Sequence, residues 1–285
     1  MATRARDLSF PFPEELAFDR ATTLDLLADF LRRESGKAGF RRVIVGLSGG
    51  IDSATAAAIA ARALGPRNVL AALLPYRTSS PGSLRDAKSV AAQLGLSTVT
   101  IAITPMIDAY FRRQRGATRL RRGNKMARER MAVLYDLSAR QRALVLGTSN
   151  KTELLLGYGT LFGDMASALN PLGDLYKTQV RMLAIHLGLP EAIVWKTATA
   201  DLWAGQSDET ELGYRYAEID RLLVRLVDHR ATPDEAREAG FSALMIDRIT
   251  RRIESSQFKR RPPIIAKLSQ RTIGVDFRYP RDWGR

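Results

Sequence analysis

Short apolar runs alternate with amphipathic segments along the first half of the chain. Runs of aliphatic and β-branched residues predict four buried strands, at 42–47, 69–74, 97–103 and 143–147. Between them, apolar residues at helical spacing predict helices at 14–35, 54–64 and 83–94, and a helical, arginine-rich stretch precedes the last strand. This order is typical of an α/β fold with a doubly wound parallel sheet, in which ligands bind at the carboxyl ends of the strands.

The second half of the chain is more helical than the first. Residues 219–227 place apolar side chains at i, i+3 and i+4, residues 232–235 form a capping-box start, and residues 244–253 indicate one more helix. No period is visible from Arg260 onward, and we expect an irregular arm that packs on the body or on a partner. We therefore expect a single domain made of an N-terminal helix, an α/β core and a C-terminal arm, at 1–37, 38–260 and 261–285.

Composition narrows the class of protein. The 285 residues are 45% hydrophobic, which is enough for a large core, and contain no run of about 18 apolar residues that would span a membrane. The first residues lack the apolar region of a secretory signal, so we expect a cytoplasmic protein. The absence of cysteine excludes disulfides, thiolate metal ligands and a cysteine nucleophile. The net charge of +14 favours an anionic partner, without separating nucleotides from RNA.

The clearest motif lies between the first predicted strand and the next helix. It reads Ser48-Gly49-Gly50-Ile51-Asp52-Ser53. Its glycines let the backbone approach an anion, and the N–H groups of the following helix can bind phosphate together with the two serine hydroxyls. No lysine follows the glycines, so the motif is not a Walker loop, and it is not the G-x-G-x-x-G fingerprint. Because Asp52 would repel phosphate on its own, we predict that it binds Mg²⁺.

This motif resembles the PP-loop of the ATP pyrophosphatases, which split ATP into AMP and pyrophosphate. A further series resembles the NAD synthetase family, in the order Asn124–Met131, Leu146–Glu153, Gly163-Asp164, Asn170–Lys177, Thr199–Trp203 and Gln206–Gly213. The resemblance covers about residues 42–260. It implies an adenine nucleotide alpha hydrolase-like, Rossmann-like sheet and a homodimer that converts deamido-NAD into NAD through an adenylated intermediate, using ATP, Mg²⁺ and ammonia.

The resemblance also implies roles for individual residues. ATP binding is implied for Gly46, Ser48, Gly49, Gly50, Ile51, Asp52, Ser53, Arg77, Thr148, Lys177 and Thr199. Binding of deamido-NAD is implied for Arg128, Leu161, Ala168, Phe258 and Lys259. Asp52 and Glu153 match the Mg²⁺ carboxylates, and Asp52, Lys177 and Asp164 are the expected catalytic residues. Asp164 matches a carboxylate near the ammonia entry, where it could bind ammonium and take its proton.

Three positions depart from the family pattern, all on the deamido-NAD side. Leu161 stands where lysine is frequent, Ala168 where an acidic residue is expected, and Phe258 where histidine precedes Lys259. The ATP side is therefore the better supported half of the site. Glutamine-using members carry an additional amidase domain with a cysteine nucleophile, and this chain has neither, so we expect free ammonia as the nitrogen source. A separate glutaminase partner stays open.

Other functions compete with this interpretation. The arginines of residues 112–122 could form an RNA-binding arm, but aromatic residues are not interleaved for base stacking, and we favour a solvated basic segment. A tRNA-modifying PP-loop enzyme, such as a lysidine-synthetase-like ligase, would suit the charge, although the segments 146–153 and 199–213 argue against it. A non-catalytic nucleotide-binding protein is disfavoured because Asp52, Glu153, Lys177 and Thr199 are all retained.

Overall fold

The computed structural model describes residues 12–114, 116–203, 205–261 and 264–273. Within them four parallel strands form one sheet in the order β3-β2-β1-β4. The strands are β1 (Val43–Gly46), β2 (Val69–Leu73), β3 (Ser97–Thr100) and β4 (Leu144–Leu146). Val43 of the central strand β1 pairs with Val69 on one side and Leu144 on the other. The four predicted strands are thus confirmed. Residues 1–11 of the expected N-terminal segment, residues 262–263 and 274–285 of the expected C-terminal arm, and Arg115 lie outside the described residues.

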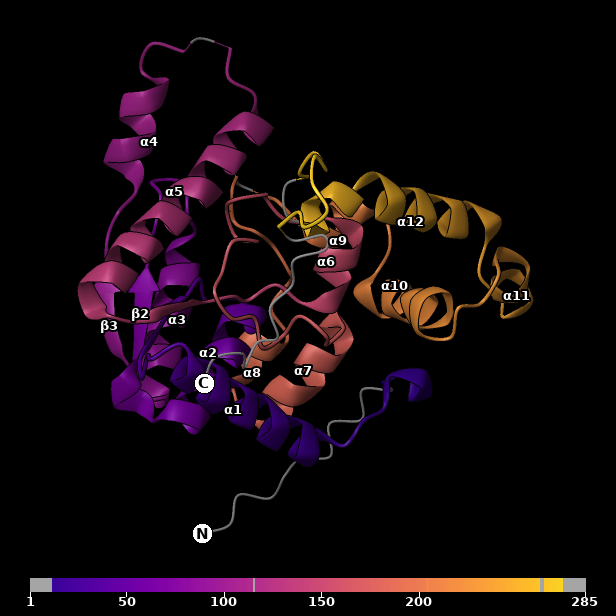
Figure 1. The fold of residues 1–285 in the computed structure, drawn as a ribbon, viewed down its shortest axis with the longest axis horizontal. Coiled ribbons are helices and arrows are strands. Elements are labelled where there is room, and N and C mark those ends of the chain that lie inside the picture. The colour runs from indigo at the N-terminus through magenta and orange to yellow at the C-terminus, as the bar shows by residue number, and fades with distance from the viewer. Residues whose placement is uncertain (1–11, 115, 204, 262–263, 274–285) are drawn as a thin grey trace.

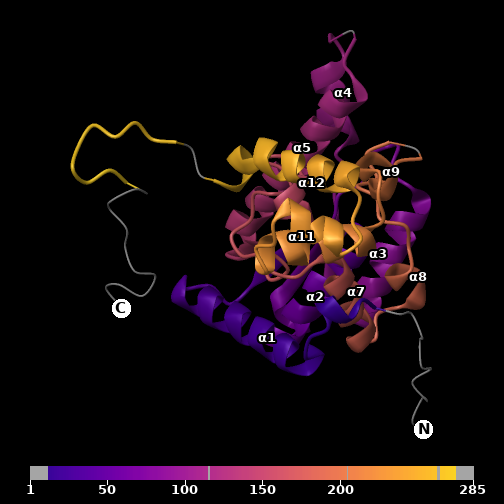
Figure 2. The ribbon, with the colours of Figure 1, turned by 90° about the vertical axis from the view of Figure 1, so that its right-hand side faces the viewer.

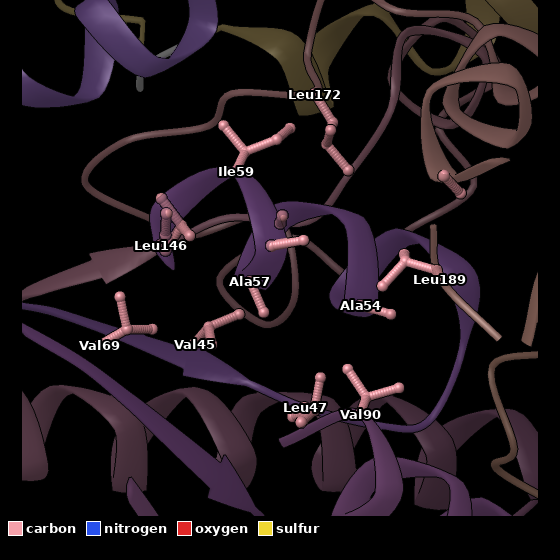
Figure 3. Packing of buried hydrophobic residues seen from close by; sticks show 14 of the residues in the cluster. Val45, Leu47, Ala54, Ala57, Ile59, Val69, Val90, Leu146, Leu172 and Leu189 are labelled. Carbon is pink, nitrogen blue, oxygen red and sulfur yellow. The ribbon is translucent and has the colours of Figure 1, made fainter. Parts of the chain in front are cut away.

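Helices cover both faces of the sheet (Figure 1). Val45, Leu73 and their neighbours on one face pack against α1 (Arg20–Lys37), α2 (Ile51–Leu64), α3 (Pro81–Gln93) and α7 (Lys177–His186), as Figure 3 shows in part. Ile44, Ala72 and Val145 point to the other face, toward α4 (Thr104–Phe111) and α5 (Arg119–Gln141). Because successive side chains of a strand alternate between faces, two covered faces require continuously apolar strands. The doubly wound prediction is confirmed.

Three predicted boundaries differ from the structure by three residues or more. The helix expected from residue 54 begins at Ile51, which places Asp52 and Ser53 in the first turn of α2. The helix expected at 14–35 begins at Arg20, since the carboxylate of Asp19 accepts from two backbone N–H groups there and ends the preceding segment. The third strand ends at Thr100, because residues 101–103 lead directly into α4.

The second half forms a helical layer beside the sheet. Its helices are α6 (Lys151–Leu156), α8 (Glu191–Val194), α9 (Asp208–Leu212), α10 (Tyr216–Leu223), α11 (Pro233–Glu238) and α12 (Ala243–Ser255), with a π-helical turn at Val224–Asp228 after α10. Ile219, Leu222 and Ile249 belong to a second apolar core that includes Tyr176 and Met182. This core joins the helical layer to α7. The predicted capping box is present, with Thr232 bonded to Glu235.

Short 3-10 turns complete the described chain, at Glu14–Leu16, Pro66–Asn68 and Gln257–Arg260. Residues 264–271 are irregular and exposed, and the segment extends away from the body (Figure 2). The predicted irregular arm is therefore present, and its side chains over these residues are exposed. No helix among the described residues combines the length and apolar character that a bilayer crossing requires.

Candidate active site

A cavity of about 550 Å³ opens where the strands β1, β2 and β4 end. Its lining includes residues 46–48 after β1, 74–75 after β2 and 147–149 after β4. The segment 196–203 lines it as well, together with Lys177 from the start of α7. This is the position at which ligands bind to doubly wound parallel sheets, and the volume lies in the range of small-molecule sites.

The glycine loop between β1 and α2 forms one wall of this cavity. Gly49 has φ +81°, and a Cβ atom built on it would lie 2.2 Å from the carbonyl oxygen of Ser83, so only glycine fits. Ser48 is fixed by its N–H, which donates to Ser53 Oγ at 3.2 Å. Gly50 is the N-cap of α2, and no side chain forms a capping hydrogen bond there. The backbone N–H groups in the first turn of α2 are therefore positioned for an anion. The phosphate-binding prediction therefore has the required geometry.

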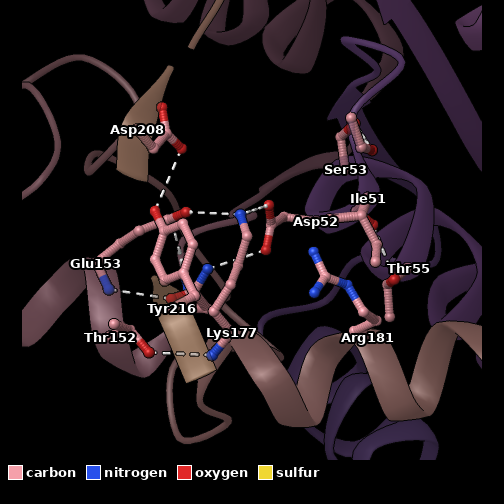
Figure 4. A network of polar contacts seen from close by, with 12 residues as sticks. Ile51, Asp52, Ser53, Thr55, Thr152, Glu153, Lys177, Arg181, Asp208 and Tyr216 are labelled. Atoms are coloured by element: carbon pink, nitrogen blue, oxygen red, sulfur yellow. Dashed lines mark hydrogen bonds and ion pairs between the residues drawn. The ribbon is translucent and has the colours of Figure 1, made fainter. Parts of the chain in front are cut away.

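Lys177 connects three elements around the cavity (Figure 4). Its side chain is only 4% exposed, and Nζ lies 2.5 Å from Asp52 Oδ2 and 3.2 Å from Glu153 Oε1. The amide of Asn150 donates to the other oxygen of Asp52 at 2.9 Å. Burial alone would lower the pKa of Lys177, but the two carboxylates outweigh it and raise that pKa, so the ammonium stays charged. Three predicted residues from α2, α6 and α7 thus meet.

The carboxylates of this cluster outnumber its cation. Burial raises the pKa of Glu153 while the neighbouring ammonium of Lys177 lowers it, and Glu153 also closes the capping box of α6 with Asn150. Asp208 acts on Lys177 as a further negative charge and accepts from Tyr158 Oη at 3.0 Å and Tyr216 Oη at 3.2 Å. Asp208 lies in a motif singled out in the sequence, but the sequence did not assign it a role. An excess of carboxylate in a phosphate site favours a bound cation.

The donor atoms of this cluster determine whether it can hold Mg²⁺. Among the described residues, no group of three His, Cys, Asp or Glu side chains could hold a metal alone. Asp52 and Glu153 offer two carboxylates, both in contact with the same ammonium. Mg²⁺ in nucleotide sites is held by one or two carboxylates together with substrate phosphates and water. The two residues therefore fit a magnesium ion that binds jointly with ATP.

A buried carboxylate supports this cluster from behind. Asp220 of α10 is fully buried, and it accepts from the Thr152 hydroxyl at 2.5 Å and from the Thr178 N–H at 2.8 Å. The same Thr152 oxygen accepts from the Lys177 N–H at 3.0 Å. Burial raises the pKa of Asp220 to about 6. Asp220 therefore fixes the first turn of α7, which carries Lys177, and sequence analysis missed it because it lies in an ordinary helical pattern.

Asp164, the expected proton acceptor, also lines the cavity. Its Oδ1 accepts from the Thr160 N–H at 2.7 Å, and desolvation by the surrounding protein raises its pKa. Lys259 lines the same cavity and donates to the carbonyl oxygens of Gly157 and Gly159, at 2.7 and 2.8 Å. Arg130 of α5 also lines the cavity, although only Arg128 of the same motif was singled out in the sequence. A carboxylate with a raised pKa, in reach of a cavity, is suited to accept a proton.

The remaining predicted residues divide into two groups. Thr148 and Thr199 line the cavity, as expected for ATP contacts. Five residues lie outside the cavity of the single chain, namely Arg77, Arg128, Leu161, Ala168 and Phe258. Arg77 is exposed and paired with Asp108 at 3.0 Å, and Arg128 is exposed and donates to the Leu161 carbonyl at 3.1 Å. The ATP-side residues thus come together except for Arg77, whereas of the deamido-NAD-side residues only Lys259 lines the cavity.

Known proteins share this fold and this series of motifs. A family model described as NAD synthase matches residues 23–263. The chain is 56% identical to an NH(3)-dependent NAD(+) synthetase of Trichlorobacter lovleyi, over 91% of this chain and 95% of that protein. A structure of NMN synthetase from Francisella tularensis has a TM-score of 0.79 at 32% identity and covers 88% of this chain and 99% of that one. An NH3-dependent NAD synthetase from Campylobacter jejuni, in complex with nitrate, has a TM-score of 0.75 at 35% identity and covers 88% and 100%. The chain belongs to the NAD synthase family.

Proposed function

We propose that this chain is an ammonia-dependent NAD synthetase, which adenylates the nicotinate carboxylate of deamido-NAD with ATP and then replaces AMP by ammonia. The observation that carries the proposal is the buried ammonium of Lys177 between Asp52 and Glu153, next to an uncapped helix N-terminus at the strand ends. Free carboxylate reacts poorly with ammonia because its leaving group would be oxide. Adenylation supplies AMP as the leaving group.

The first step is a displacement at the α-phosphorus of ATP. A carboxylate oxygen of the substrate forms the new P–O bond, and the bond to the bridging oxygen of the β-phosphate breaks, which releases pyrophosphate. The glycine loop and the first turn of α2 bind the phosphates, and Lys177 stabilises the negative charge that develops on pyrophosphate. Asp52 and Glu153 would hold Mg²⁺, which neutralises phosphate charge when bound.

The second step requires neutral ammonia, because ammonium has no lone pair. Asp164 is placed to bind ammonium and take one proton, and its raised pKa makes it a stronger base than an ordinary aspartate. Ammonia then forms a C–N bond at the activated carbonyl carbon, the C–O bond to AMP breaks, and the nitrogen releases one further proton to solvent to give the neutral amide. Lys259 fixes the backbone of residues 157 and 159 beside Asp164.

The same proposal includes a homodimer. Arg128 and Phe258, both assigned to the dinucleotide, are exposed and lie outside the cavity of the single chain. A second copy that brings such side chains to the cavity would complete the deamido-NAD pocket. A separate glutaminase could supply the ammonia, since the chain has no cysteine for that chemistry.

A narrower substrate is the second candidate. The Francisella tularensis structure is described as an NMN synthetase, and Leu161, Ala168 and Phe258 depart from the family pattern on the dinucleotide side. An enzyme that amidates the mononucleotide would use the same ATP chemistry and would not need the adenosine half of deamido-NAD. The two candidates therefore differ only in the substrate test.

A product assay tests both candidates. Purified protein, ATP and Mg²⁺ are mixed with deamido-NAD or nicotinate mononucleotide, and with ammonium or glutamine, while the amidated product, AMP and pyrophosphate are followed. We expect NAD and AMP in equal amounts from deamido-NAD with ammonium and not with glutamine. A higher kcat/KM for the mononucleotide would favour the second candidate. Absence of AMP and pyrophosphate with both substrates would refute the assignment and make tRNA the next substrate to test.

A further inference from the structure

A short segment after α8 forms part of the cavity wall and is attached to α3. We call residues 196–201 the strap; all of them line the cavity. At its first residue, Lys196 Nζ lies 2.7 Å from Asp86 Oδ2 and 3.2 Å from Ser83 Oγ, both on α3. At its last residue, the carboxylate of Asp201 accepts from the Ser80 N–H at 3.1 Å, at the N-cap of α3. Thr199, an expected ATP contact, lies between the two attachments.

Lys196 also contacts the glycine loop. Its ammonium donates to the carbonyl oxygen of Gly49 at 3.2 Å. Gly49 in turn lies directly against the backbone of α3, as the 2.2 Å approach of its virtual Cβ to the Ser83 carbonyl shows. One ammonium group therefore joins the glycine loop, α3 and the strap. These three elements surround the phosphate side of the cavity.

Lys196 can either bind a phosphate of ATP or hold the surrounding elements in place, and the number of its hydrogen bonds distinguishes these two roles. A lysine ammonium has three N–H donors, and the oxygens of Gly49, Ser83 and Asp86 accept from all three. No donor is left for a phosphate, although Lys196 lines the cavity next to the glycine loop. We infer that Lys196 is a positioning residue, which fixes the distance between Thr199 and the glycine loop and acts on ATP only through them. This inference rests on the proposed function.

Two single variants and their combination test the inference. Lys196→Met and Asp86→Ala both break the same contact, so each should raise the KM and the Kd for ATP by about tenfold. The change should be moderate because the two side chains are partly exposed, at 25% and 30%. The double variant should be no worse than the worse single variant, because both act on one contact. The KM for deamido-NAD should stay within about twofold, since the strap borders the phosphate side.

The controls separate direct and indirect action. Lys88→Met removes an exposed lysine from the same helix and should leave all constants unchanged. Ser83→Ala removes one neutral acceptor, and should shift ATP binding in the same direction but less, which keeps the test informative if a charged variant does not fold. Thermal denaturation identifies variants that have lost the fold.

Two results would overturn the inference. If Asp86→Ala binds ATP like the wild type while Lys196→Met loses binding, Lys196 contacts the phosphates itself. If neither variant changes ATP binding, the contact has no part in positioning. The Kd is measured by calorimetry with a non-hydrolysable ATP analogue and no dinucleotide. A wild type that binds the analogue but makes no NAD would therefore count against the proposed function and leave the test of Lys196 intact.

Discussion

Replacing Asp220 by asparagine should change the pH dependence of stability. Asp220 is fully buried, and burial raises its pKa from the ordinary 3.8 to about 6 in the folded protein. The folded state therefore binds this proton more tightly than the unfolded chain, and the ionised carboxylate destabilises the fold above pH 6. One pH unit corresponds to about 1.4 kcal/mol, so the full penalty is about 3 kcal/mol. It decreases as the pH falls through 6.

Asparagine has the same shape as aspartate but carries no group that titrates in this pH range. Its Oδ1 can accept from the Thr178 N–H, and its Nδ2 can donate to the Thr152 oxygen, so the variant should fold. The free energy of unfolding is measured by urea denaturation of both proteins between pH 4.5 and 7.5. From pH 7.5 to 4.5 the wild type should gain about 2 kcal/mol relative to D220N, which is the part of the penalty within that range. Asp136→Asn, an exposed aspartate on α5, is the matched control.

The direction in which the relative stability of wild type and D220N changes with pH tests this reasoning. A constant difference between wild type and D220N across this range would mean that Asp220 does not titrate there. A wild type that gains stability relative to D220N as the pH rises would mean that the hydrogen bonds from Thr152 and Thr178 outweigh burial and lower the pKa. Either result would refute the reasoning from burial.

Three further variants test the site. Gly49→Ala should lower the melting temperature and weaken ATP binding about tenfold or more, because the added Cβ would meet the Ser83 carbonyl. Gly65→Ala is the control: Gly65 has a similar φ of +83° but open space around it, so this variant should not affect ATP binding. Lys177→Met should lower the rate of AMP formation in single turnover by about 10² to 10³, with the fold checked by circular dichroism. Asp164→Asn should raise the KM for ammonium. In the wild type, kcat/KM for ammonium should decline as the pH falls through the raised pKa of Asp164, and in the variant this decline should be absent.

Much of the ATP side could be predicted because it follows from local rules. Strands covered on both faces must be apolar along their length, and this made β1, β2 and β4 visible in the sequence. The exposed edge strand β3 is marked instead by its β-branched residues. Parallel strands bring their carboxyl ends to one edge, so motifs that follow β1 and β4 meet there. Asp52 and Glu153 accordingly lie in contact with the same ammonium of Lys177. The PP-loop predicted a carboxylate beside the glycine loop, and Asp52 lies there at the cavity wall; the anion site itself stays a prediction.

The supporting residues could not be predicted, because their partners are distant in the sequence. Lys196 lies 147 residues from Gly49 and 110 from Asp86, and Asp220 lies 68 residues from Thr152. No periodic pattern or motif marks such contacts; only the tertiary fold brings them together. The deamido-NAD side of the site could not be predicted for a different reason. Arg128 and Phe258 are exposed in one chain, and the side chains that would complete their pocket belong, in our proposal, to a second copy.

Asp220 also links the stability of the fold to the arrangement of the active site. At neutral pH its ionised carboxylate is costly to bury, yet it holds the N–H of Thr178 and, through Thr152, the N–H of Lys177. A neutral asparagine makes weaker hydrogen bonds at the same positions. D220N should therefore be at least as stable as the wild type at pH 7.5 and still turn over more slowly, with the loss in kcat rather than in the KM for ammonium. A variant that is both more stable and fully active would mean that Lys177 keeps its position without this carboxylate, and that the packing of α7 alone is sufficient.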